Sequence, residues 1–133
     1  MIDIESTVFN RIADIFDAKY PKGSRYGESV TSPPRFPCLT VEMVDNYTYQ
    51  GSLDAEHKEH NAWVVFEVNV YSNLTRGAKQ QCKAILDMVD TELQSLNFVR
   101  LFSTPGKNAD KKYSRVTARY RAVVSEDYII YRR

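Results

Sequence analysis

The chain has 133 residues, of which 43% are hydrophobic and 26% are charged. This length suits a single domain, and this composition excludes a disordered or fibrous class. Eighteen basic residues stand against seventeen acidic ones, a formal net charge of +1, so bulk charge gives no argument for a polyanionic partner. No apolar run approaches the roughly 20 residues that span a bilayer, and we expect no membrane association.

The compartment is suggested by the first residues and by the cysteines. Asp3 and Glu5 stand where a secretion signal would carry basic residues, so we expect no export by that route. The two cysteines, Cys38 and Cys82, are too few for a disulfide scaffold. They fit a protein made in a reducing cytoplasm.

The first element in chain order is a helix over residues 3–19. Its apolar residues recur at three- and four-residue steps, and its acidic residues come early, as the helix dipole favours. A proline and a glycine end the helix at residues 20–23. A short edge strand is expected at residues 26–30. The helical stripe consists of Ile4, Val8, Ile12, Ile15 and Phe16.

Three prolines in residues 32–37 force an extended backbone. Such a segment can be a proline-rich ligand for an aromatic groove, but we favour a stiff lead-in to the next strand. That strand is predicted over residues 38–44, with Leu39, Val41 and Met43 on one face. Thr40 and Glu42 lie on the other face.

A polar connection over residues 45–61 is longer than most loops in a compact domain, and such loops are usually functional or mobile. His57 and His60, with two neighbouring glutamates, suggest a metal site. However, their three-residue spacing lacks the arrangement that places two ligands on one helix face. We therefore favour a solvated charged loop, and we predict neither a metal nor a cofactor.

The central stretch of the sequence is a strand over residues 63–71 followed by a long helix. The strand alternates with a period of two, and the helix carries one apolar stripe, so we expect the two to pack together. Thr75 or Asn73 is the expected N-cap of the helix, in preference to an anion-binding helix start. The stripe consists of Ala78, Cys82, Ile85, Leu86, Val89, Leu93 and Leu96.

Further strands are predicted at residues 97–102 and 113–124, with a possible terminal strand at residues 128–131. One-sided alternation favours antiparallel pairing, because parallel strands buried on both faces would be apolar throughout. The predicted fold is a single α+β domain: a mostly antiparallel sheet of about four main strands with two helices on one face.

The face of this sheet away from the helices carries the candidate functional residues. A solvated surface with cross-strand ion pairs explains such residues equally well. However, the mixture of tryptophan, tyrosine and arginine is typical of protein–protein interfaces, so we expect a homo-oligomer. The candidate subunit-interface residues are Glu42, Glu67, Asn69, Arg115, Arg119, Arg121, Trp63 and Tyr71. The candidate partner-docking loop contributes Tyr47, Tyr49, His57 and His60.

No constellation of nucleophile, base and orienting group is visible in the sequence, so we expect no catalysis. Glu42 and Glu67 are a candidate acid pair, but the arginines on the same face would neutralise them. A different hypothesis is a nucleic-acid-binding module in which these arginines and Tyr113 form a platform on an open sheet. The near-neutral charge weakens that hypothesis.

Four segments follow one another along the chain: SPPRFPC at 32–38, FEVNVYSN at 66–73, RYRAVV at 119–124 and YRR at 131–133. In this order they resemble the small tail-terminator, or tail-completion, proteins of long-tailed phages and prophages of Gram-positive bacteria. The resemblance spans nearly the whole chain. The neighbouring head-completion and connector proteins have a similar size and class.

The resemblance implies a ring, usually a hexamer, at the tail–head junction of the virion. Such a ring caps the tail tube and then joins the head, so the tube protein and a head-completion or connector protein are the implied partners. It also implies a lumen for DNA passage, without enzyme activity or cofactor.

Overall fold

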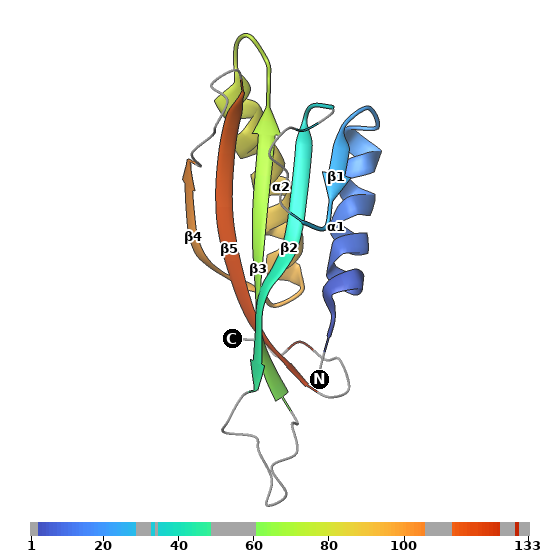
Figure 1. The fold of residues 1–133 in the computed structure, drawn as a ribbon, viewed down its shortest axis with the longest axis vertical. Coiled ribbons are helices and arrows are strands. Elements are labelled where there is room, and N and C mark those ends of the chain that lie inside the picture. Colours follow the sequence, from blue (N-terminus) through green and yellow to red (C-terminus); the bar gives the residue numbers. More distant parts are fainter. Residues whose placement is uncertain are drawn as a thin grey trace, which may run out of the picture.

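The computed structural model describes residues 3–28, 33, 35–48, 61–105, 113–125 and 130. In these residues the chain forms two helices and five strands, and both helices lie against the same face of one sheet (Figure 1). The α+β prediction is therefore confirmed. We call the sheet face away from the helices the outer face. The elements in chain order are α1 (Glu5–Lys19), β1 (Ser24–Tyr26), β2 (Cys38–Thr48), β3 (Asn61–Ser72), α2 (Ala78–Ser95), β4 (Val99–Pro105) and β5 (Ser114–Ser125).

The strands are ordered β1-β2-β3-β5-β4 across the sheet. The pairs β2–β3, β3–β5 and β4–β5 are antiparallel, whereas β1 runs parallel to β2. The prediction of a mostly antiparallel sheet is thus confirmed. The sheet has five strands rather than about four, because the three-residue β1 joins its edge.

Strand β3 supplies the centre of the core. Its helix-facing side chains are fully buried, and from Phe66 to Val70 they lie opposite apolar or aromatic side chains of both neighbours: Val68, for example, is paired with Val41 of β2 and Ala118 of β5. Helix α2 covers this layer and α1 packs beside it, joined to α2 by an ion pair of 2.5 Å between Arg11 Nε and Glu92 Oε1. The helix-facing residues of β3 are Ala62, Val64, Phe66, Val68 and Val70.

Both helices bury most of the predicted stripes. In α1, Val8, Ile12 and Phe16 are buried, and the helix ends where the Tyr20 amide donates to the Phe16 carbonyl at 2.7 Å. Helix α2 buries five residues of the predicted stripe together with one aspartate. The buried residues of α2 are Cys82, Ile85, Leu86, Val89, Asp90 and Leu93.

The predicted N-cap of α2 is wrong. The helix starts at Ala78, after Gly77, which has a φ of 78° and provides no side-chain cap. Glycine adopts this left-handed conformation without steric cost, so the chain turns into the helix at Gly77 rather than at Thr75 or Asn73.

The β2–β3 hairpin is longer than predicted. Pairing continues past an irregularity between Met43 and Asp45 as far as Thr48, which lies opposite Ala62. Tyr47 is therefore a strand residue and not a loop residue. The rest of the predicted docking loop, with Tyr49, His57 and His60, lies outside the described residues.

The last strands also differ in their limits. Phe98 is buried edge-on against Phe66, at a ring distance of 5.6 Å, and β4 starts only after it, at Val99. Of the predicted terminal strand, the structure describes Ile130, which forms one antiparallel bridge with Val124. The predicted edge strand at residues 26–30 is β1, which lies at Ser24–Tyr26.

Gly23, in the turn between α1 and β1, is closely packed at the edge of the sheet. A Cβ at Gly23 would lie 2.6 Å from the Pro37 carbonyl oxygen and 2.9 Å from the Phe16 ring. We expect Gly23→Ala to lower the free energy of unfolding by about 1–3 kcal/mol, because the backbone must move to make room. Urea unfolding followed by circular dichroism measures this change.

Gly27→Ala is the matched control, because its Cβ would meet nothing nearer than the Val41 carbonyl oxygen at 4.0 Å. We expect it to change stability by less than about 0.5 kcal/mol. Equal effects of the two substitutions would contradict the packing argument.

Candidate interaction surface

Strand register aligns the outer-face side chains in rows that cross the sheet. In the first row Val99 of β4 lies opposite Arg121 of β5, which lies opposite Val65 of β3. Val65 in turn lies opposite Asp45 of β2. The row therefore runs from an apolar side chain through an arginine to a carboxylate.

The second row repeats this order one step along the strands. It contains Phe102, Arg119, Glu67 and Glu42, from β4 to β2. The Arg119 Nε lies 3.6 Å from the Glu67 Oε1, which is an ion pair too long for a good hydrogen bond. The arginine side chain remains 43% exposed. We refer to this row and the first one as the two charged rows.

An aromatic cluster flanks the first row. The Arg121 guanidinium lies over the Trp63 ring, with its carbon 4.3 Å from the ring centroid. Tyr47 stacks against Trp63 at 6.4 Å and is 44% exposed. A cation over an indole face gains about 0.5–1 kcal/mol at an exposed site, so this contact holds the guanidinium flat on the sheet.

In the half of the outer face nearer Ser72, the side chain of Arg115 covers its neighbours on β3. The Nε and Nη2 of Arg115 donate to the Asn69 Oδ1 at 3.0 and 2.8 Å, and the Thr117 hydroxyl donates to the same oxygen at 2.6 Å. Arg115 also lies over the Tyr71 ring at 5.5 Å. Asn69 and Tyr71 are consequently buried, 1% and 2% exposed.

Strand β4 is exposed along its whole length and is the edge of the sheet on that side. Of the five exposed large apolar side chains in the described part of the chain, three are on this strand: Val99, Leu101 and Phe102. Edge strands usually carry outward charges that discourage association. The charged residue of β4, Arg100, instead turns toward α2.

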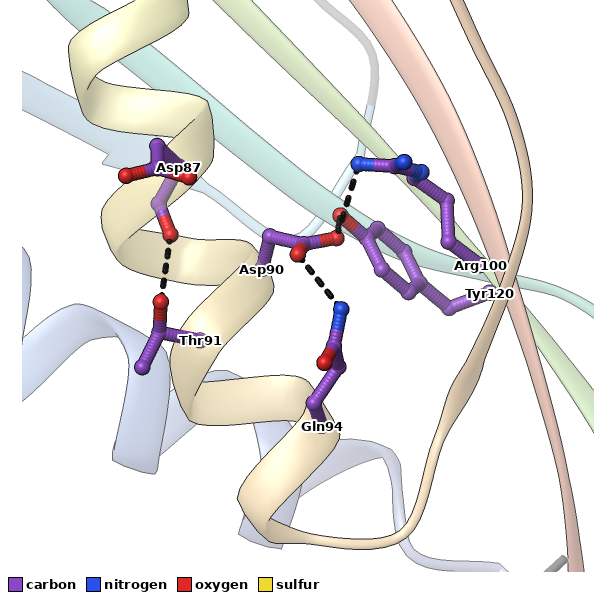
Figure 2. A network of polar contacts seen from close by, with 6 residues as sticks. All are labelled: Asp87, Asp90, Thr91, Gln94, Arg100 and Tyr120. Carbon is purple, nitrogen blue, oxygen red and sulfur yellow. Dashed lines mark hydrogen bonds and ion pairs between the residues drawn. The ribbon is translucent and has the colours of Figure 1, made fainter.

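Figure 2 shows the side chain of Arg100 directed toward Asp90 of α2. The Asp90 carboxylate of α2 accepts a hydrogen bond of 2.6 Å from the Tyr120 hydroxyl and one of 2.7 Å from the Gln94 amide. The Nη1 of Arg100 lies 3.4 Å from the same carboxylate. This network ties α2 to β5 and β4, and it draws the charge of Arg100 away from the sheet edge.

Burial raises the pKa of Tyr120 well above its ordinary value, and the neighbouring Asp90 carboxylate adds to the rise. The hydroxyl therefore remains a donor through the physiological range. The group acts as a structural tie.

The two cysteines show the features of packing residues. Both are fully buried, and burial raises the pKa of the Cys82 thiol to about 11. Burial also raises the pKa of the Cys38 thiol. A thiolate is the reactive form of cysteine, so neither side chain is set up as a nucleophile.

The residues that the structure describes contain neither a cluster of metal-ligating side chains nor a membrane-spanning helix. Within them, no three His, Cys, Asp or Glu side chains gather closely enough to hold a metal ion. No helix among them is long and apolar enough to cross a membrane.

The structure thus sorts the predicted interface residues into two groups. All eight lie on the outer face, as their parity predicted. Trp63, Glu67, Arg119 and Arg121 lie with Glu42 in its open half, whereas Asn69 and Tyr71 are closed off beneath Arg115. Sequence reasoning missed Asp45, Val99 and Phe102, because only the register aligns them with the arginines.

Comparisons with known proteins support the fold. No protein-family model and no curated protein matches this sequence. One solved structure superposes with a TM-score of 0.52 at 18% sequence identity, covering 89% of this chain and 92% of that chain. At this identity the similarity shows a shared fold.

The network at Asp90 predicts a stability effect. Tyr120→Phe removes the shortest hydrogen bond to the buried carboxylate and keeps the ring. We expect the free energy of unfolding to fall by about 1–3 kcal/mol, because Asp90 loses a donor it cannot replace. Thr91→Ala, on the exposed side of the same helix, should change it by less than about 0.5 kcal/mol.

The same variant has a pH signature. An unfolded tyrosine ionises near pH 10, whereas the raised pKa keeps folded Tyr120 neutral. This contribution to stability is present below pH 10 and is lost as pH rises above it. Urea unfolding above pH 10 should therefore show a shallower loss of stability in Tyr120→Phe than in the wild type; equal slopes would contradict this assignment.

Proposed function

We propose that this protein is a non-catalytic structural protein of a phage virion. In this role it forms a ring that caps the tail tube and later joins the tail to the head. The motifs that resemble tail-terminator proteins support this role, and so does a fold that leaves half of one sheet face open.

One observation carries the proposal. The open half of the outer face combines the Tyr47–Trp63–Arg121 cluster with exposed Val99 and Phe102 at the edge of the sheet. Buried aromatic and arginine anchors supply most of the binding energy of protein interfaces. A surface of this kind is what repeated copies of one chain need in order to associate.

The carboxylates on the same surface favour a protein partner over a nucleic acid. Glu67 and Glu42 lie in one row with Arg119, and Asp45 lies in one row with Arg121. A phosphate backbone needs a surface of one sign, because its binding energy comes from neutralised phosphates. In the proposed role, DNA passes through the ring without sequence recognition.

The experiment is assembly of the purified protein, alone and with tail tubes of its phage. We expect annular particles by negative-stain microscopy and a mass of several subunits by light scattering. Phe102→Ser should raise the concentration for half-assembly by roughly tenfold, because it removes an apolar anchor at the sheet edge.

Leu74→Ser is the matched control, since Leu74 is 47% exposed and Phe102 is 42% exposed. Leu74 lies in the segment before α2, away from the outer-face rows, so its replacement should leave assembly unchanged. A wild-type protein that stays monomeric with tail tubes present, at every salt and protein concentration, would refute the proposed function.

A further inference from the structure

The two charged rows have opposite charges at their two sides. Arg121 and Arg119 lie on β5, next to the β4 edge, and Asp45 and Glu42 lie on β2. At the level of these rows β2 is itself an edge of the described sheet, because β1 pairs only with Cys38–Thr40. We call the β4–β5 side, whose β5 strand supplies the arginine of each row, the cationic margin, and the β2 side, which supplies the outermost carboxylate, the anionic margin. The Arg121 guanidinium itself lies over the Trp63 ring of β3.

In the first row the two charges do not meet within one chain. Arg121 and Asp45 are separated by Val65, two strand spacings or about 10 Å across the sheet. Among the described residues no carboxylate pairs with Arg121, and its buried Nε has no hydrogen-bond acceptor. Asp45 is exposed, and no cation of the described residues forms an ion pair with it.

We infer that the partner of Arg121 is Asp45 of a second copy of this chain. In this contact the β4–β5 margin of one copy packs against the β2 margin of the next, with Val99 beside Tyr47. The guanidinium turns from the Trp63 ring of its own chain to the carboxylate of the next copy. This inference rests on the proposed ring and names its contact.

The chemistry of the two margins supports a second copy as the occupant. Each margin carries the charge that the other lacks, and each adds exposed apolar or aromatic surface, Val99 on one side and Tyr47 on the other. A contact between two different surfaces of the same chain is heterologous, and repeated heterologous contacts generate a ring when the rotation between copies closes. Charge pairs at such contacts fix orientation and register more than affinity.

Charge reversal tests the pairing. Arg121→Glu and Asp45→Arg each place like charges at the contact, so each alone should raise the concentration for half-assembly at least about tenfold. The double variant restores opposite charges and should assemble again. A 1:1 mixture of the two single variants should also assemble, with the two chains alternating around the ring. Sedimentation velocity measures the concentration for half-assembly, and native mass spectrometry measures how many copies of each variant a mixed ring contains.

Arg76→Glu and Asp14→Arg are the matched controls, since both residues are exposed and lie off the outer face. They should assemble as the wild type does. Circular dichroism and urea unfolding show that each variant is folded before its assembly is compared.

The outcomes separate the two proposals. Single variants that assemble at the wild-type concentration would overturn this pairing and leave the ring intact. The pairing would also be overturned if the folded single variants failed to assemble as a 1:1 mixture and the double variant failed to assemble as well. Duplex DNA binding that is lost in Arg121→Glu and kept in Asp45→Arg, without any change in assembly, would assign Arg121 to phosphate instead. A wild type that never assembles would refute the proposed function itself.

Discussion

The pairing of β3 on both sides is the constraint on which the rest of the structure depends. β3 is hydrogen-bonded to β2 along one edge and to β5 along the other over almost its whole length. Its alternate side chains are either fully buried under the helices or placed on the outer face. A shift of one residue in either register would exchange these two sets, so the core and the outer face are fixed together.

The Asp90 network transmits this constraint to the edge strand. Tyr120 is a core residue of β5 and donates to a helix carboxylate, which in turn lies beside Arg100 of β4. A buried acceptor with several donors holds its partners in one arrangement, because breaking the set leaves a desolvated charge. Because Arg100 turns to Asp90, the exposed edge strand β4 presents apolar side chains without an outward charge beside them. In the proposed ring, the network that holds α2, β4 and β5 together would therefore also leave an apolar edge for association.

The fold was largely predictable because its periodicities are strong. The stripe at Ile85 and Val89 and the alternation around Phe66 each leave one interpretation, and the helix–sheet layering follows from them. The N-cap was not predictable in the same way. Thr75 has the right chemistry, but the backbone freedom of Gly77 decided where the helix began. The limits of β2 depended on its partner, since a polar sequence joins a sheet when a neighbouring strand continues alongside it.

The outer face was predictable only in part, for a physical reason. Parity assigns Arg121 and Trp63 to one face, but it cannot align residues that lie on different strands. Register does this, and it places Asp45 and Val99 in the row of Arg121 while closing Asn69 beneath Arg115. Residues of equal parity therefore have unequal access to a partner. In a chain with a net charge of +1, the separation of charge across a row, rather than its total, distinguishes one margin from the other. Two different margins on one chain are what head-to-tail association requires, whereas a face of uniform charge would repel its own copies.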